Sequence, residues 1–391
     1  MNKYMGLLEL KIEKFSEYFS VFCKGRYWLL YAVLISFFLS VLVAFPEKDQ
    51  FYPTSNGEFM GVMKKAETPF TQINFAPGSH SSKLSFRMTV PVIIHVFHFN
   101  ILAVKITEVV FGLLLFYLTG KLIYRAASNR VFAFWAVLAV GQIWAGMTAF
   151  IETRGMFDGI AIVFLLLALF FEKPFAIGIL TFTASFTDER ALVASIFVLA
   201  YHMNMSVDMR DFKGLPKALF APKCAAVLLA WALYLISRLV LSVKFGLQTD
   251  TGGVGLDLFV SQILNFFPGL WSGLEGFWLI PALALLELFR RKQYTFTILY
   301  FAGLSMVAVT AMSVIDITRS MAYLYPAVFI GFKILSGVKS DRFLRNMLFA
   351  TLLISFLWPC YYFVGETDCL LWEPSLLVRI IDSILVTGGF W

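Results

Sequence analysis

Apolar stretches of about 20 residues recur along nearly the whole chain, and this pattern limits the possible folds more than any single motif does. An α-helix rises 1.5 Å per residue, so about 20 apolar residues cross a hydrocarbon core about 30 Å thick. Of the 391 residues, 59% are hydrophobic and 15% are charged, whereas soluble domains have roughly 45–50% apolar and about 25% charged residues. The sequence therefore predicts an all-α, polytopic integral membrane protein.

The apolar runs predict about eleven membrane spans. Their approximate limits are 27–45, 101–122, 131–150, 156–171, 174–186, 191–201, 224–243, 270–289, 294–315, 320–335 and 343–363. The fifth and sixth runs are short, and each reaches only about 20 Å as a helix. We therefore expect residues 188–190, which lie between them, to sit below the membrane surface. Residues 375–391 fit either a further span or an interfacial helix.

The chain is expected to divide into a cytoplasmic amphipathic helix, residues 1–26, and a single transmembrane domain, residues 27–391. In the first part Ile12, Phe15 and Phe19 follow one another at steps of three and four, with Lys and Glu between them. This spacing is typical of a helix with one apolar face. The first apolar run follows about 26 mostly polar residues and has no cleavage site after it, so we interpret it as a signal anchor.

The distribution of basic residues predicts the orientation. Most of the 32 Lys and Arg residues fall in alternate loops, and such loops face the cytoplasm. This pattern predicts a multi-pass protein of the inner (plasma) membrane with a cytoplasmic N-terminus and a first extracytoplasmic loop, residues 46–100. The net charge of +7 follows from these loops and does not indicate a nucleic-acid partner.

Acidic and arginine residues gather near the predicted outer ends of the spans. They are Asp49, Glu58, Arg87, Glu152, Arg154, Asp158, Asp188, Glu189, Arg190, Asp316 and Arg319. A charge at membrane depth costs about 2.5 to 3.5 kcal/mol on insertion scales, so Asp158 in particular needs an explanation. One explanation is a polar cavity that opens outward. The other is that the charges pair with one another, for example Asp158 with Arg154 at helical spacing.

These residue types suit phosphate binding and proton transfer. A guanidinium group binds phosphate through a planar, bidentate fork, and a carboxylate can accept the proton of an attacking hydroxyl. The motifs that carry them are Phe86-Arg87-x-x-x-Pro91, Glu152-x-Arg154-x-x-x-Asp158, Asp188-Glu189-Arg190-Ala191 and Asp316-x-Thr318-Arg319. Together they favour a lipid-linked phosphate donor and an alcohol acceptor.

In this layout the chain resembles the GT-C class of multi-spanning glycosyltransferases, and more closely the uncharacterised bacterial membrane proteins that are similar to that class. The likeness lies in an acid-bearing first outer loop (Glu47 to Glu58), in a basic residue and proline at its end (Arg87 and Pro91), and in short polar interruptions at outer helix ends. It covers the whole chain in layout but only short motifs in residues. The resemblance implies a polyprenyl-phosphate sugar donor, a glycan or lipid acceptor, and transfer on the extracytoplasmic face.

The resemblance also implies roles for individual residues. The catalytic base would be a first-loop carboxylate, Asp49 first and Glu58 second, although the class often shows an acid pair where this loop has Glu47-Lys48-Asp49. The donor phosphate would be bound by Arg87, Arg190 and Arg319. The further substrate-binding residues would be Lys83, Arg154, Asp158, Asp188, Glu189 and Asp316.

Two other functions fit the same sequence. A flippase or secondary transporter of lipid-linked sugars should show internal repeats and ionisable residues near the middle of the membrane, and neither is evident. A polysaccharide polymerase or ligase would share the arginine-rich outer end. No cofactor is expected, and a requirement for a divalent metal is left open. The chain has no P-loop, HExxH or GxSxG motif, which argues against an ATP-driven pump, a zincin and a serine hydrolase. His80, His95 and His98 are close in sequence, and His95 and His98 share a helical face, but no further ligand follows them at metal spacing. A disulfide between Cys360 and Cys369 is left open.

Overall fold

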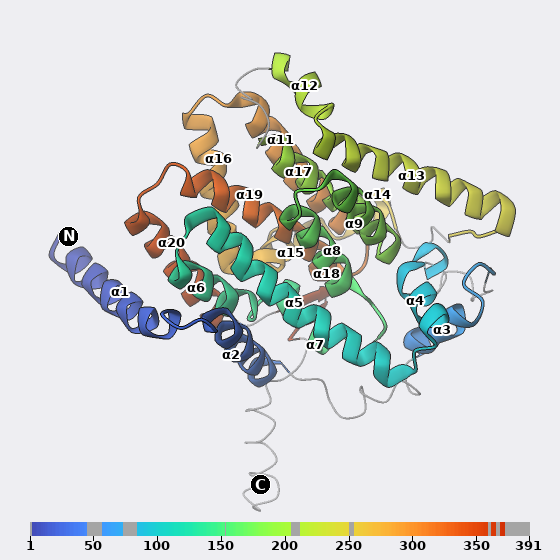
Figure 1. Cartoon of the computed structure of the whole chain (residues 1–391), viewed down its shortest axis with the longest axis horizontal. Helices are drawn as coiled ribbons and strands as arrows, with labels where there is room; N and C mark the ends of the chain where they lie inside the picture. The colour runs from blue at the N-terminus through green and yellow to red at the C-terminus, as the bar shows by residue number, and fades with distance from the viewer. Residues whose placement is uncertain are drawn as a thin grey trace, which may run out of the picture.

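The computed structural model describes residues 2–44, 57–72, 84–152, 154–204, 212–249, 254–358, 361–364 and 368–371. Within these residues the chain is helical except for one antiparallel hairpin, β1 (Tyr361–Val364) with β2 (Asp368–Leu371), in which Val364 lies opposite Asp368. The helices pack into one bundle, with α1 and α2 at one side and α3 and α4 at the other (Figure 1). The predicted all-α class is confirmed apart from the hairpin.

Helices make up most of the described residues. In chain order they are α1 (Asn2–Cys23), α2 (Trp28–Val43), α3 (Gly57–Glu67), α4 (Thr89–Phe97), α5 (Ile101–Ala127), α6 (Arg130–Val140), α7 (Trp144–Ile151), α8 (Asp158–Phe170), α9 (Pro174–Thr187), α10 (Arg190–Ala194), α11 (Ile196–Asn204), η4 (Phe212–Gly214), α12 (Leu215–Leu219), α13 (Pro222–Phe245), α14 (Leu256–Ser261), η5 (Ile263–Asn265), α15 (Phe266–Leu274), η6 (Glu275–Trp278), α16 (Leu279–Arg290), α17 (Tyr294–Met312), α18 (Ile317–Met321), η7 (Ala322–Leu324), α19 (Tyr325–Ser336) and α20 (Asp341–Leu357).

Fewer helices are long enough to cross a membrane than the eleven spans predicted. Four described stretches qualify by length and composition: Ile101–Ala127, Pro222–Phe245, Ile263–Arg290 and Tyr294–Met312. Two bent pairs raise the number to six if each pair is one span. They are Glu9–Cys23 with Trp28–Val43, bent by 113°, and Arg130–Val140 with Trp144–Ile151, bent by 56°. The prediction overcounted because hydropathy does not register helix breaks, which leave α8 and α9 with only 13 and 14 residues.

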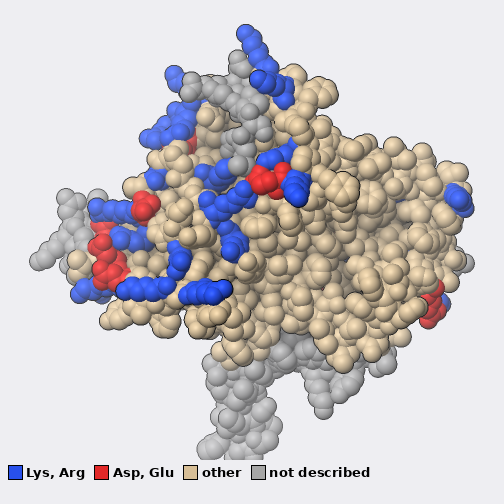
Figure 2. Space-filling view, in the orientation of Figure 1, with Lys and Arg blue, Asp and Glu red and all other residues tan. Residues whose placement is uncertain are grey.

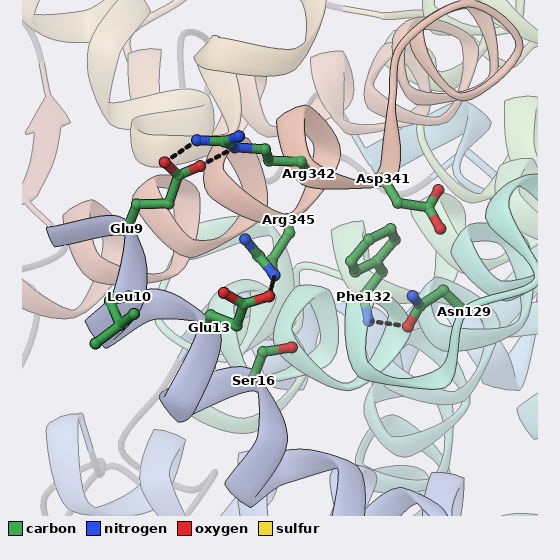
Figure 3. Close-up of a pocket in the computed structure, with 9 residues that line it drawn as sticks. All are labelled: Glu9, Leu10, Glu13, Ser16, Asn129, Phe132, Asp341, Arg342 and Arg345. Atoms are coloured by element: carbon green, nitrogen blue, oxygen red, sulfur yellow. Dashed lines mark hydrogen bonds and ion pairs between the residues drawn. The ribbon is translucent and has the colours of Figure 1, made fainter. Parts of the chain in front are cut away.

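The N-terminal helix α1 is amphipathic as predicted, and its apolar face packs on the bundle. The ring of Phe15 lies 5.8 Å from that of Trp135 on α6 and 5.4 Å from that of Phe349 on α20. Glu9 pairs with Arg342, and Glu13 lies 3.4 Å from Arg345. These pairs border a polar cavity of about 390 Å³ between α1, α6 and α20 (Figure 3). The α1 helix therefore packs along the surface of the bundle, with Ile12 and Cys23 buried against it.

Part of the first loop folds back onto the bundle. Helices α3 and α4 pack against each other and against α5 and α8, burying a cluster that includes Phe59, Val62, Ile94, Val104 and Ile160. The α4 helix, Thr89–Phe97, lies near the end of this loop. This packing brings the first loop next to the beginning of α8.

Most charged side chains on the visible surface gather in one part of it. Figure 2 shows Lys and Arg toward its upper left, around α1, α12, α16 and α20, and a wide surface to the right with charged side chains only near its edge. Among the basic residues of these elements, Arg290 ends α16 and Arg342 lies in the first turn of α20. An uncharged belt of this kind suits contact with lipid tails.

A glycine at the break between α6 and α7 allows a close backbone approach. A Cβ added at Gly146 would overlap the carbonyl oxygen of Val140, whereas one added at Gly25 would have nothing within 4 Å. We therefore expect Gly146→Ala to lower the free energy of unfolding by about 1 to 3 kcal/mol and Gly25→Ala to change it by less than about 0.5 kcal/mol. Thermal unfolding of both variants in detergent would measure this difference. Equal stability of the two variants would contradict the packing.

A buried lysine on α3 predicts a pH dependence of stability. Lys65 is buried and donates to the carbonyl oxygen of Thr71 at 3.2 Å, and burial lowers its pKa from 10.5 to about 8. The unfolded chain therefore binds more protons than the folded chain between these two pH values, and the free energy of unfolding rises with pH across that window. The gain is at most about 3 kcal/mol. We expect Lys65→Met to abolish this rise.

Unfolding measured at several pH values from about 7 to about 10.5, for the natural protein and both variants, tests the Lys65 assignment. Lys64→Met is the matched control, because the neighbouring Lys64 side chain is exposed. If the natural protein and Lys65→Met keep parallel pH profiles, burial of Lys65 does not control this stability.

Candidate functional site

Several helix breaks meet at one end of the bundle and bring charged residues together. Asp158 begins α8, Asp188 and Glu189 connect α9 to α10, and Arg319 lies in the short helix α18. Arg87 comes from the segment that precedes α4. The predicted convergence of arginines and carboxylates from distant parts of the sequence is therefore present.

Asp158 is the centre of this cluster and is fully buried. Its Oδ1 atom accepts hydrogen bonds from Arg190 Nη2 at 2.6 Å and from the Tyr323 hydroxyl at 2.9 Å. Its Oδ2 atom lies 2.6 Å from Arg319 Nε. One carboxylate thus joins α8, α10, α18 and η7.

Arg190 is held from several sides. Its Nε and Nη2 atoms donate to the two carboxylate oxygens of Asp188, each at 2.7 Å, and its Nη1 atom donates to Ser320 Oγ at 2.8 Å. The backbone N–H of Arg190 also donates to Asp188 Oδ1 at 2.9 Å. The guanidinium lies 5.1 Å from the ring centre of Tyr323. Asp188 therefore fixes both the start of α10 and the direction of the arginine that follows it.

Arg87 lies at the edge of the cluster. Its Nη2 atom is 3.2 Å from both Asp188 Oδ2 and Glu189 Oε1, and its Nε atom donates to Glu189 Oε2 at 3.3 Å. The Arg87 side chain is 12% exposed and that of Glu189 is 35% exposed.

Arg154 and Asp316 extend the cluster on its other side. Arg154 donates to Glu152 through Nε at 3.0 Å and Nη2 at 2.6 Å, and its Nη2 lies 3.4 Å from the Tyr362 hydroxyl on β1. Arg319 Nη1 donates to Asp316 at 2.8 Å.

The predicted pairing of Asp158 with Arg154 is wrong. Asp158 pairs with Arg190 and Arg319, and Arg154 pairs with Glu152. The reason is that α8 begins only at Asp158, so the residues before it are not helical and the i, i+4 spacing does not apply.

The cluster is largely compensated in charge. Arg87, Arg190 and Arg319 face four carboxylates, those of Asp158, Asp188, Glu189 and Asp316. Arg319 is only 1% exposed, so it lies in protein and not on the wall of a water-filled cavity. Mutual pairing accounts for the innermost members, and Arg87 with Glu189 forms the accessible edge.

Several predicted residues lie outside the described part of the chain. These are Asp49, Lys83, His80, Cys360 and residues 375–391, and for Glu58 and Cys369 the backbone lies in α3 and β2 while the side chain is outside the description. Within the described residues, no group of three or more His, Cys, Asp or Glu side chains is arranged to hold a metal ion.

Sequence reasoning did not identify the uncharged partners of Arg190 and Asp158, which are Ser320 and Tyr323. Both residues closely follow Arg319 in the sequence, and this proximity could have suggested that they belong to the cluster. Sequence reasoning also missed one buried acid. Glu275 interrupts the apolar stretch Ile263–Arg290, where α15 meets η6, and it is 1% exposed with φ +45°. Neither of its carboxylate oxygens has a hydrogen-bond partner among the described residues. The signal for it was an acid near the middle of a long apolar run, 15 residues before the basic end of that run at Arg290.

Comparison with protein-family models, curated proteins and solved structures finds no match to this chain. Any function must therefore be argued from its own residues.

Mutations at the centre and at the edge of the cluster should lower the free energy of unfolding by very different amounts. Asp158→Asn leaves two buried guanidinium groups without their shared carboxylate, so we expect the free energy of unfolding to fall by about 3 to 5 kcal/mol. Glu189→Gln removes a partly exposed partner, and we expect a loss of less than about 1 kcal/mol. Unfolding of the purified variants in detergent measures both. A Glu189→Gln loss as large as that of Asp158→Asn would contradict the assigned centre and edge.

Proposed function

We propose that this chain is a membrane glycosyltransferase that moves a sugar from a polyprenyl-phosphate-linked donor to an acceptor glycan or lipid. The observation that carries the proposal is the gathering of Arg87, Arg190 and Arg319 with carboxylates at one end of a bundle of apolar helices. An anionic headgroup on an apolar chain requires such a junction between cationic and lipid-facing surfaces. We further propose that this end faces away from the cytoplasm of the inner membrane and that the N-terminus is cytoplasmic, as the basic residues of the opposite end favour.

Among the three arginines, Arg87 is the best donor-phosphate ligand. Its carboxylate partner Glu189 is partly exposed, so a phosphate can replace that partner without leaving a buried charge unpaired. Arg190 and Arg319 are buried and held by Asp158, and in this proposal they position the neighbouring backbone. Arg154, with a side chain that is 29% exposed, is a second cation for the substrate.

The packing of α3 supports a first-loop carboxylate as the base. A Cβ added at Gly155 would lie 3.0 Å from the Cα atom of Phe59. Phe59 directly follows Glu58, and Gly155 directly follows Arg154. Helix α3, which contains Glu58 and follows Asp49 in the sequence, therefore packs against the residue next to Arg154.

The proposed reaction uses these groups in simple roles. A first-loop carboxylate accepts the proton of an acceptor hydroxyl, whose oxygen attacks the anomeric carbon of the donor sugar. The bond from this carbon to the lipid phosphate breaks, and Arg87 stabilises the charge that develops on the departing phosphate.

Loss of the proposed catalytic groups should stop transfer while the protein remains in the membrane. We expect Asp49→Asn to lower transfer at least about 100-fold, since general base catalysis contributes typically 10²–10⁴-fold. We expect Arg87→Gln to raise the KM for the donor about tenfold or more. Lys244→Gln, an exposed change on α13, is the control. The measurement is sugar transfer in membranes, together with mass spectrometry of surface glycans and lipid-linked sugars after deletion of the gene.

The products in the deletion strain separate this proposal from its alternatives. Loss of one sugar residue supports transfer, and loss of chain length supports a polymerase or ligase. Lipid-linked sugar that accumulates on the cytoplasmic side supports a flippase. Unchanged glycans in the Asp49→Asn strain would remove Asp49 as the base.

A carrier for lipid-linked sugars is the second candidate, and Glu275 favours it. This carboxyl group is buried near the middle of the apolar stretch Ile263–Arg290, and its oxygens lack hydrogen-bond partners among the described residues. Ionisable residues at this depth often mark ion or proton pathways. If Glu275→Gln abolished translocation in vesicles while transfer remained absent in the natural protein, the carrier would replace the enzyme.

A further inference from the structure

An apolar groove runs along the outside of the helix pair α9 and α13. Its first part is a cavity of about 580 Å³ lined by residues of both helices, among them Phe175, Gly178 and Phe182 of α9 and Ala225, Leu229 and Leu233 of α13. The helices approach closely here, because a Cβ added at Gly178 would lie 3.2 Å from the carbonyl oxygen of Ala226. The groove floor is therefore narrow and apolar.

The groove continues toward the arginine cluster. A second cavity of about 590 Å³ shares Phe182 with the first and is lined further along by Phe186, Ile236, Val240 and Met88. From Pro222 to Leu241 the α13 helix rises roughly 28 Å. The two cavities thus follow α13 for most of its length and end beside the segment that carries Arg87.

Arg238 of α13 lies near this end of the groove and has no carboxylate partner among the described residues. Arg238 of α13 donates to the Tyr234 hydroxyl at 3.1 Å and to Thr249 Oγ1 at 2.9 Å, and its guanidinium lies 4.3 Å from the ring centre of Phe86. Within the part of the chain that the structure describes, no ion pair joins Arg238 to a carboxylate. A cavity of about 440 Å³ opens beside it, with Gln248 and Thr249 in its wall.

The charge and the shape together select the occupant. An arginine inside a membrane-spanning helix is costly unless an anion or water compensates it, and a phosphate can accept several of its N–H groups. The groove is lined almost entirely by apolar side chains along both cavities, so it suits a hydrocarbon chain. The Phe86 ring that lies 4.3 Å from the Arg238 guanidinium belongs to the residue directly before Arg87, so both arginines lie beside the same short segment of the chain.

We propose that the groove between α9 and α13 binds the isoprenoid chain of a polyprenyl phosphate and that Arg238 binds its phosphate together with Arg87. This inference rests on the proposed function and names the part of the protein that selects the donor. It assigns a role to α13, which the charged cluster itself does not require.

Photocrosslinking of the full-length protein in nanodiscs tests the groove. The probe is an isoprenoid phosphate with a diazirine on its chain, and labelled peptides are identified by mass spectrometry. We expect labelling of α9 and α13, competition by unlabelled isoprenoid phosphate, and at least about tenfold weaker competition by the isoprenoid alcohol or by phosphatidylglycerol. Equal competition by phosphatidylglycerol, or labelling confined to other helices, would overturn the proposal.

Matched variants separate the chain site from the phosphate site. We expect Ala225→Trp, which fills the groove, to reduce labelling several-fold, and Leu229→Trp is a second filling change at an exposed lining residue. We expect Arg238→Gln to weaken phosphate competition about tenfold and to leave competition by the alcohol unchanged. Ile298→Trp on the exposed face of α17 and Lys244→Gln on α13 are the controls. Full labelling in all variants would refute the site.

The outcomes distinguish failure of the groove from failure of the enzyme. If transfer occurs and requires Asp49 but is insensitive to Ala225→Trp and Arg238→Gln, the groove proposal fails and the transferase stands. If the probe labels the groove as expected and no sugar is transferred, the binding site stands and the enzyme proposal fails.

Discussion

The pairing of the buried Asp158 carboxylate with two guanidinium groups is the interaction on which the rest of the cluster depends. A carboxylate removed from water costs several kcal/mol unless cations and hydrogen bonds compensate it. Asp158 has Arg190, Arg319 and the Tyr323 hydroxyl within 2.9 Å. Because these partners come from α10, α18 and η7, compensation of one charge fixes the relative positions of helices that are distant in the sequence.

This arrangement also explains why the backbone can be irregular here. Non-helical segments at membrane depth are tolerated where they are buried in protein and their polar groups are satisfied. At the α9–α10 break Asp188 accepts from the backbone N–H and the side chain of Arg190. Before α8, Glu152 accepts from both the backbone N–H and the side chain of Arg154. Each break thus carries its own acid, which satisfies the local backbone and directs an arginine.

The sequence was sufficient to predict the helical class, the amphipathic α1 and the convergence of Arg87, Arg190 and Arg319. These follow from composition and periodicity, which act over many residues. It was not sufficient for the span count or for the partner of Asp158, because both depend on where helices break. A spacing of four residues means contact only inside a helix, and here the non-helical Gly155, with φ +86°, stands between Arg154 and the start of α8 at Asp158. Glu275 was missed because its burial results from packing by other helices.

The compensation of charge within the cluster decides which arginines can exchange partners. An anion that displaced Asp158 from Arg190 or Arg319 would leave a carboxylate buried without a cation, which is the expensive outcome. An anion that displaced Glu189 from Arg87 would release a side chain that already reaches solvent, and Asp188 would keep its ion pair with Arg190. An anion that bound Arg238 would displace no carboxylate among the described residues, because the neighbours of Arg238 are two hydroxyl groups and an aromatic ring. The electrostatic boundary therefore runs between Arg87 and Arg190, with the fixed part of the cluster inside it and the exchangeable part toward the groove.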